Sequence, residues 1–339
     1  MYRLFEKTKI KNVELKNRLV RSATFENYFV NKSFKFLGEL YEKLSKNEVG
    51  LLITGNFSVC ANGRAGDIYD LEDKDVIKEL PVLVSACHKY DTKVLMQLNH
   101  VGRQAFAKDL KQGPPVAPSS IFDSAFAVMP KPMTIKEIEY VRYKFVEGAL
   151  IAKKAGFDGI QLHAAHGYLL SQFLSPHINR RGDSYGGNTK NRCKLIIDIA
   201  KEIRSKINNN FLISVKLNCH DLYTDGIDRE EFLNICRLFN NVFDAIEVSA
   251  GTLENAINFF KYFKDEPSFY RNYSRSAKAV FKGTVILVGN NRNPHTLTEI
   301  LDNEEADLIS VSRGLIAEPA LYKRWKDGDL RDSKCTNCG

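Results

Sequence analysis

The chain has 339 residues, of which 44% are hydrophobic and 27% charged, with a formal net charge of +8. This is an ordinary globular composition that allows a sizeable core. The lysines are dispersed over many predicted helices, which argues against nucleic-acid binding, and no apolar run approaches the roughly 18 residues of a membrane helix. The N-terminus lacks a secretory signal pattern, and most of the seven cysteines stand singly, so we expect a cytoplasmic protein.

Eight short apolar runs alternate with helical patterns along most of the chain. Two of the helices are predicted at residues 135–155 and 191–207. This alternation predicts a (β/α)8 TIM barrel, with residues 1–326 as a single domain and a C-terminal tail at 327–339. The alternative, a doubly wound sheet, lacks a G-x-G-x-x-G turn after its first strand. The predicted strands cover residues 19–22, 51–56, 94–99, 159–163, 212–218, 245–249, 285–289 and 308–312.

A weak internal repeat supports the barrel. Asp158, Asp244 and Asp307 each stand just before a predicted strand, in GFDGIQL, VFDAIEV and EADLISV. Recurring βα units would produce such a pattern. Residues 103–133 fall outside the repeat and form a proline-rich loop, which we expect to be a lid or binding segment.

Polar residues gather where the predicted strands end, and in a (β/α)8 barrel function collects at those ends. His163, His166 and Tyr168 follow the fourth strand. Two imidazoles and a phenol are hydrogen-bond donors that can hold a carbonyl oxygen and deliver a proton beside it. Histidines satisfied within the core and a zinc site are the alternatives, although a His-x-x-His pair lacks a third zinc ligand.

The seventh and eighth strands end in glycine-containing turns, each before a predicted helix. Their backbone amides, nearby helix N-termini and Arg313 suit a phosphate group. Ordinary turn chemistry would explain the same glycines, so both interpretations stay open.

Several motifs together resemble the Old Yellow Enzyme family of FMN-dependent ene-reductases. The longest is GIQLHAAHGYLLSQFLSPHINRRGDSYGG at residues 159–187. The segments LKNRLVRSATFE, GLLITGNF, LMQLNHVGRQ, ISVKLN and EADLISVSRGLIAEP also look like family segments in family order. The resemblance implies an FMN-binding barrel that reduces activated C=C bonds, such as those of α,β-unsaturated carbonyl compounds, with NADH or NADPH. In this scheme hydride passes from the nicotinamide to the flavin, and from flavin N5 to the substrate.

The resemblance also implies residue roles at the substrate. His163 and His166 match the pair that donates hydrogen bonds to the activating carbonyl, and Tyr168 matches the proton donor. Tyr28 adjoins the position of a substrate-facing tyrosine in some members. Arg180, Arg181 and Asp183 are expected to tie their own loop together.

A second set of residues matches flavin-contacting positions. The amide of Gln97 suits the pyrimidine edge of the flavin. The charge of Lys216, where many relatives have arginine, would stabilise the anionic reduced flavin; pairing with an acid is its alternative role. The implied flavin contacts are Ser22, Ala23, Thr24, Asn56, Gln97, Lys216, Gly289, Asn290, Ser312 and Arg313.

Other functions remain open. Cys335 and Cys338 are similar to the first half of a four-cysteine iron–sulfur site in larger relatives that resemble 2,4-dienoyl-CoA reductase. The pair is then a vestige, a truncated motif or a redox-sensitive dithiol, and the chain could be the barrel of such an enzyme. A flavin-free lyase or isomerase acting on a phosphorylated substrate, and a non-enzymatic flavin-binding scaffold, are further alternatives. A homo-oligomer is possible, and the sequence does not choose between NADH and NADPH.

Overall fold

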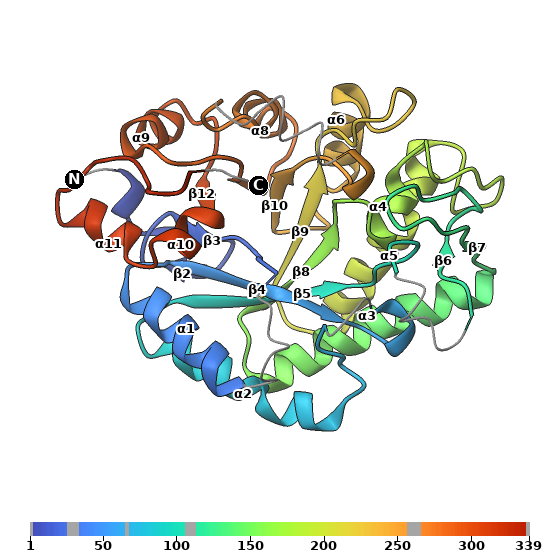
Figure 1. Ribbon diagram of the computed structural model, residues 1–339, viewed down its shortest axis with the longest axis horizontal. Coiled ribbons are helices and arrows are strands. Elements are labelled where there is room, and N and C mark those ends of the chain that lie inside the picture. The colour runs from blue at the N-terminus through green and yellow to red at the C-terminus, as the bar shows by residue number, and fades with distance from the viewer. Residues whose placement is uncertain (1–2, 26–33, 65–67, 106–112, 256–265, 337–339) are drawn as a thin grey trace.

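Eight parallel strands form a closed barrel, and helices surround it (Figure 1). The structure is a computed structural model that describes residues 3–25, 34–64, 68–105, 113–255 and 266–336. The predicted (β/α)8 barrel is confirmed. Around the barrel the strands are β3 (Leu19–Arg21), β4 (Leu51–Ser58), β5 (Lys93–Asn99), β8 (Gly159–Ala164), β9 (Leu212–Asn218), β10 (Ala245–Ser249), β11 (Thr284–Leu287) and β12 (Leu308–Val311), and β12 pairs with β3 to close it.

The helices begin and end at recognisable caps. Thr134 and Glu137 form a capping box at the start of α3 (Ile135–Ala155), and Gly156 ends it with φ of 95°. The helix α5 (Thr189–Lys206) begins two residues before its predicted start because the Asn188 side chain caps it. Among the described residues, the other α-helices are α1 (Phe34–Lys46), α2 (Lys74–His88), α4 (Leu169–Leu174), α6 (Arg229–Leu238), α8 (Arg271–Lys278), α9 (Pro294–Asp302), α10 (Arg313–Ala317) and α11 (Leu321–Lys326). None of the helices in the described ranges is long and apolar enough to cross a membrane.

The inside of the barrel changes from apolar to polar along the strands. At the N-terminal end, inward residues such as Leu95, Leu212 and Leu308 form one apolar cluster with Ile10 and Leu15. The last two come from the hairpin of β1 (Thr8–Ile10) and β2 (Val13–Leu15). Side chains alternate along a strand, so the next inward position lies two residues further on. Those positions hold buried polar residues: Gln97, Ser214, Glu247 and Ser310.

The aspartates of the sequence repeat link neighbouring strands at the N-terminal end of the barrel. Asp158 accepts a hydrogen bond from the backbone N–H of Val94, Asp244 from that of Ile213, and Asp307 from that of Val285, each at 2.8 Å. Each aspartate side chain therefore satisfies the N–H of the second residue of the strand that precedes its own in the barrel. This shared role explains the repeat.

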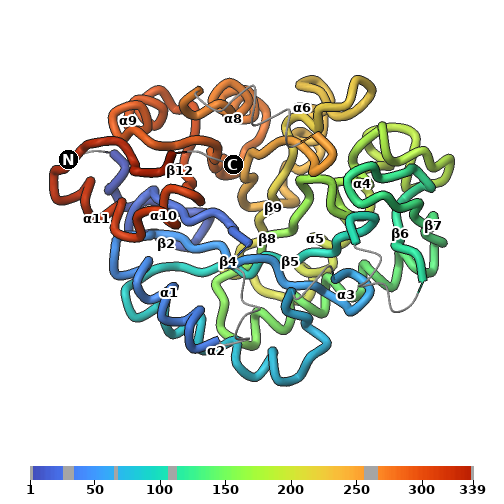
Figure 2. Tube along the Cα trace, viewed as in Figure 1, coloured from blue at the N-terminus to red at the C-terminus, as the bar shows by residue number. Residues whose placement is uncertain are grey.

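The long connection between β5 and α3 carries two further strands, β6 (Val116–Ala117) and β7 (Lys131–Pro132). Figure 2 traces it along the right of the view, where β6 lies beside α4. The predicted loop is thus partly ordered by a short parallel pair. At the other end of the chain, the backbone of Ser333 donates to the carbonyl of Arg292. A boundary at residue 326 between barrel and tail stays a prediction.

Candidate active site

A cavity of about 330 Å³ lies among the residues that follow the C-terminal ends of the barrel strands. This is the end at which function was expected. Its lining includes many of the predicted site residues, which come from widely separated parts of the chain: Ser22, Ala23, His166, Tyr168, Lys216, Gly289, Ser312 and Arg313.

His163, His166 and Tyr168 meet at the end of β8. The ring centroid of His163 lies 5.1 Å from that of His166 and 4.7 Å from that of Tyr168, with both pairs edge to face. The chain turns sharply here, because His166 and Gly167 both have positive φ, of 61° and 80°. Asn218 accepts a hydrogen bond from the His166 backbone N–H at 3.1 Å and holds this turn against β9.

Both imidazoles are neutral donors. Burial, and then electrostatic interaction with His166 and with the Lys216 ammonium, hold the pKa of His163 well below its usual value. Burial, and then the Lys216 charge, likewise lowers the pKa of His166. His166 Nε2 lies 2.7 Å from the hydroxyl of Ser249, which leaves its Nδ1 as the nitrogen for a ligand.

The strand register aligns two rows of polar side chains below the cavity. Asn56 pairs with Gln97, and Gln97 with Gln161, across β4, β5 and β8. His163 pairs with Lys216, and Lys216 with Glu247, across β8, β9 and β10. Neighbours in a row point to the same face of the sheet, so these residues converge inside the barrel.

Lys216 is paired with an acid as well as exposed to the cavity. Its Nζ lies 3.3 Å from Oε2 of Glu247 and donates to the Ser22 hydroxyl at 2.9 Å. Burial raises the pKa of Glu247, but the Lys216 charge and hydrogen bonds from Ser22, Ser310 and Gln161 outweigh it and lower that pKa. The glutamate is therefore ionised, and both predicted roles of Lys216 remain compatible.

The turns after β11 and β12 form the other end of the cavity. Gly289 has φ of 111°, and a Cβ atom there would lie 2.6 Å from the Tyr270 ring, so only glycine fits. Gly289, Ser312 and Arg313 also line an adjoining pocket of about 70 Å³, together with Asn290 and Cys335. The helix α10 has only five residues, so its N-terminus should contribute little to binding the expected phosphate group.

The remaining predicted residues take different places. Gln97 is buried and donates to Gln161 at 2.7 Å. Thr24 shares a hydrogen bond of 2.7 Å with Ser312, which joins the ends of β3 and β12. Tyr28 and Cys338 lie outside the described residues.

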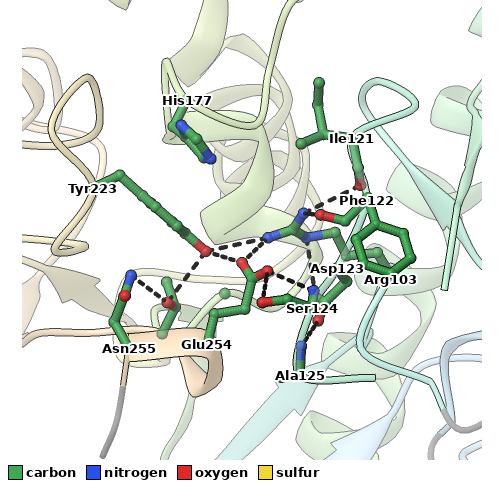
Figure 3. Close-up of polar contacts among 12 residues, drawn as sticks. Arg103, Ile121, Phe122, Asp123, Ser124, Ala125, His177, Tyr223, Glu254 and Asn255 are labelled. Atoms are coloured by element: carbon green, nitrogen blue, oxygen red, sulfur yellow. Dashed lines mark hydrogen bonds and ion pairs between the residues drawn. The ribbon is translucent and has the colours of Figure 1, made fainter. Parts of the chain in front are cut away.

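A buried polar cluster fastens the long connection beside the cavity (Figure 3). Arg103 pairs with Asp123, at 3.1 Å from Nε to Oδ2, and with Glu254. Glu254 also accepts from the Tyr223 hydroxyl and from the backbone N–H of Ser124, the latter at 2.7 Å. Burial raises the pKa of Glu254, but the Tyr223 and Ser124 hydrogen bonds and the Arg103 charge lower it overall. The cluster joins three loops, and residues 252 and 253, next to Glu254, line the cavity.

The loop after α4 is a scaffold, as expected. Arg181 binds Asp183 and donates to the carbonyls of Pro118 and Met133. Arg180 donates to the carbonyl of His177 within the same loop and also pairs with Asp225. This loop therefore also supports both ends of the β6–β7 segment.

Comparison with known proteins decides the family. The profile of the NADH:flavin oxidoreductase / NADH oxidase family matches residues 3–331. The chain is 32% identical over 342 residues to an NADH oxidase of Thermoanaerobacter brockii, which covers 99% of this chain. It is also 32% identical to an NADPH dehydrogenase of Clostridium acetobutylicum, over 94% of this chain and 92% of that protein. The chain belongs to this family.

Solved structures agree on the fold of this family member. An old yellow enzyme homologue from Zymomonas mobilis superposes with a TM-score of 0.84 at 21% identity, over 98% of this chain and 95% of that one. A 2-naphthoyl-CoA reductase in complex with 2-naphthoyl-CoA superposes with a TM-score of 0.90 at 23% identity, over 99% of this chain and 54% of that one. The chain spans 52% of the Thermoanaerobacter NADH oxidase, about half its length.

Membership confirms the resemblance to the Old Yellow Enzyme family, and with it FMN as cofactor and a nicotinamide reductant. It sets aside the flavin-free lyase or isomerase.

The residues present fit FMN. The buried Oδ1 atom of Asn56 accepts no hydrogen bond from any described residue, and Lys216 supplies a cation in the same cavity region as Ser22. The glycine turn at Gly289 with Arg313 supplies a cradle at the other end.

Sequence reasoning missed Glu247, Gln161 and Ser310, which connect the predicted flavin residues below the cavity. One signal was visible: Glu247 is a carboxylate in the otherwise apolar strand motif AIEVS. A charge within a strand that is buried on both faces requires a partner. The aromatic wall of Phe269 and Tyr270 carried no comparable signal.

Proposed function

We propose that this protein reduces activated C=C bonds, such as those conjugated to a carbonyl group, with NADH or NADPH. The observation that supports the proposal most is the convergence of His163, His166 and Tyr168, because His166 and Tyr168 line the cavity together with Lys216 and His163 packs against both. The family comparison supports a flavin oxidoreductase, and these three side chains point to the class of substrate.

The two histidines would hold the carbonyl oxygen of the substrate. The backbone N–H of Ala165 points to His163 Nδ1 at 3.4 Å, so Nε2 of that ring carries the proton. His166 offers Nδ1. Two neutral N–H donors stabilise the negative charge that builds on this oxygen when hydride adds to the β-carbon.

Tyr168 would protonate the α-carbon. Burial raises the pKa of its phenol, so it retains the proton at neutral pH. The side chain is only half-buried, so solvent can restore the proton after each turnover. The edge-to-face contact with His163 fixes the phenol beside the site of the carbonyl.

FMN, when bound, supplies the hydride that it accepts from the nicotinamide. Gln97, Lys216 and Ser22 would hold its ring system, and Gly289 and Arg313 its phosphate. Phe269 and Tyr270 give the cavity an apolar wall that excludes water from one side.

The test is anaerobic turnover with a panel of enones, nitroalkenes and enoates. NADH or NADPH consumption that depends on the alkene, with the saturated product found by mass spectrometry, supports the proposal. Consumption that occurs only with oxygen, and with no saturated product from any member of the panel, refutes it.

A second candidate is the barrel of a larger enzyme with further redox centres. The relation to an NADH oxidase twice as long as this chain favours it. The mass of the protein in its native source separates the two. A mass near 38.5 kDa favours the single barrel, and about twice that mass, with bound iron, favours the larger enzyme.

A further inference from the structure

Glu247 is a carboxylate buried inside the barrel, directly below the cavity. It has no exposed surface, and four donors surround it. Its Oε1 accepts from the hydroxyls of Ser22 at 2.7 Å and Ser310 at 2.8 Å, and its Oε2 accepts from Gln161 at 3.0 Å. The Lys216 ammonium lies 3.3 Å from Oε2. Such a complete donor set keeps the carboxylate ionised despite its burial.

Two of the four donors to Glu247, Lys216 and Ser22, are themselves proposed flavin contacts. Lys216 and Ser22 line the cavity themselves. Gln97 reaches the carboxylate through Gln161, by hydrogen bonds of 2.7 Å and 3.0 Å. One carboxylate therefore fixes the side chains on which the flavin ring system would rest.

The charges of Lys216 and Glu247 oppose each other at this position. A lone buried cation beside the flavin would stabilise negative charge on the reduced ring and raise the reduction potential. An ionised carboxylate behind that cation offsets part of the effect, and the low polarity of the barrel interior keeps the screening weak.

We propose that Glu247 is a positioning residue that lowers the reduction potential of the bound flavin by compensating the charge of Lys216. The inference rests on the proposed contact between the flavin and Lys216. A lower potential makes the reduced flavin a stronger hydride donor, which suits the reduction of an alkene.

The test is the reduction potential of the FMN-loaded protein, measured by anaerobic equilibration with a reference dye. Glu247→Gln, which removes the charge and keeps the shape, is expected to shift the ratio of reduced to oxidised flavin at least tenfold toward the reduced form. For a two-electron couple this corresponds to about 30 mV. Glu247→Asp keeps the charge and should stay closer to the wild type.

Glu305→Gln is the matched control. Glu305 is also a buried carboxylate in an ion pair, with Arg271, but it precedes β12 at the opposite end of the barrel. Its substitution should leave the potential unchanged. A Glu247→Gln protein with the potential of the wild type overturns the inference.

Two further variants separate this inference from the proposed function. If Lys216→Met changes neither the potential nor the FMN affinity, the flavin does not contact Lys216, and the placement itself is wrong. If Lys216→Met lowers the potential and Glu247→Gln has no effect, only the inference fails. If Glu247→Gln does not bind FMN, the double variant Lys216→Met/Glu247→Gln tests the inference. Its potential should return toward that of the wild type, and a potential equal to that of Lys216→Met contradicts the inference.

Discussion

Tyr168 is the residue on which the proposed proton transfer depends. Tyr168→Phe keeps the ring and its contact with His163 but removes the proton. We expect alkene reduction to slow by about 10²–10⁴-fold, the usual contribution of a general acid, while flavin reduction by NAD(P)H is unchanged. Stopped-flow measurement of the two half-reactions checks this. Tyr143→Phe, at an exposed tyrosine of α3, is the control. If Tyr168→Phe and the wild type reduce the alkene at equal rates, Tyr168 is not the proton donor.

Three histidines, of which His100 and His163 are buried and His166 is half-buried, make the fold sensitive to acid. The pKa of His163, of His166 and of His100 lies below the usual value because burial disfavours the charged ring, with that of His100 at about 4. Below about pH 6.5 the unfolded chain therefore binds more protons than the folded one, and stability falls as pH falls. The melting temperature should drop between pH 7.5 and 5.0, and His163→Asn should show a shallower drop. The same slope in both proteins would contradict this account.

For individual residues, the sequence predicted which side chains belong to the site better than it predicted the side chains that pair with them. His163, His166 and Lys216 were recognisable because their side chains suit the chemistry and their motifs match a family. The pairing of Lys216 with Glu247 depends on the register between β9 and β10. Residues 31 positions apart become neighbours only once the barrel closes, and no local pattern encodes that distance.

Among the structural elements, the connection between β5 and α3 depends most on the Arg103 cluster. Arg103→Met would leave Asp123 and Glu254 buried without their cation, which typically destabilises by about 3–5 kcal/mol. Because Leu253 lines the cavity next to Glu254, we also expect a raised KM for the alkene with an unchanged flavin spectrum. Steady-state kinetics and thermal unfolding check both effects.

The control for that variant lies in the same connection. Lys131 forms an exposed ion pair with Glu137, and such pairs contribute at most about 1 kcal/mol. Lys131→Met should therefore alter neither KM nor unfolding appreciably. If the Arg103 and Lys131 variants behave alike, the cluster does not shape the cavity.

Element types were predictable, and their ends less so. The eight strands were recognised as buried apolar runs, which carry their signal locally. β11 nevertheless ends at Leu287, two residues before its predicted end, because the chain must reach the positive φ of Gly289. The β6–β7 pair was not predicted, because two-residue strands form only when tertiary contacts bring them together.

The whole barrel depends on the aspartates at its N-terminal end. Asp244→Ala removes the acceptor of the Ile213 N–H and the partner of Arg204 and Lys11. Loss of that acceptor should lower the free energy of unfolding by about 1–3 kcal/mol. Alkene kinetics should stay unchanged, because the cavity lies at the opposite end. Asp302→Ala, at an exposed aspartate paired with Arg3, is the control for denaturant unfolding. Equal stability of the two variants would contradict the role of the repeat.

As a whole, the barrel is proposed to transfer reducing equivalents from a nicotinamide through FMN to an activated alkene. The most direct measurement is an anaerobic double-mixing experiment that follows the flavin absorbance. NADH or NADPH should bleach the flavin, and a subsequent enone should restore the colour without oxygen and yield the saturated ketone. A bleached flavin that no enone, nitroalkene or enoate reoxidises, and that recovers only with oxygen, would contradict the account.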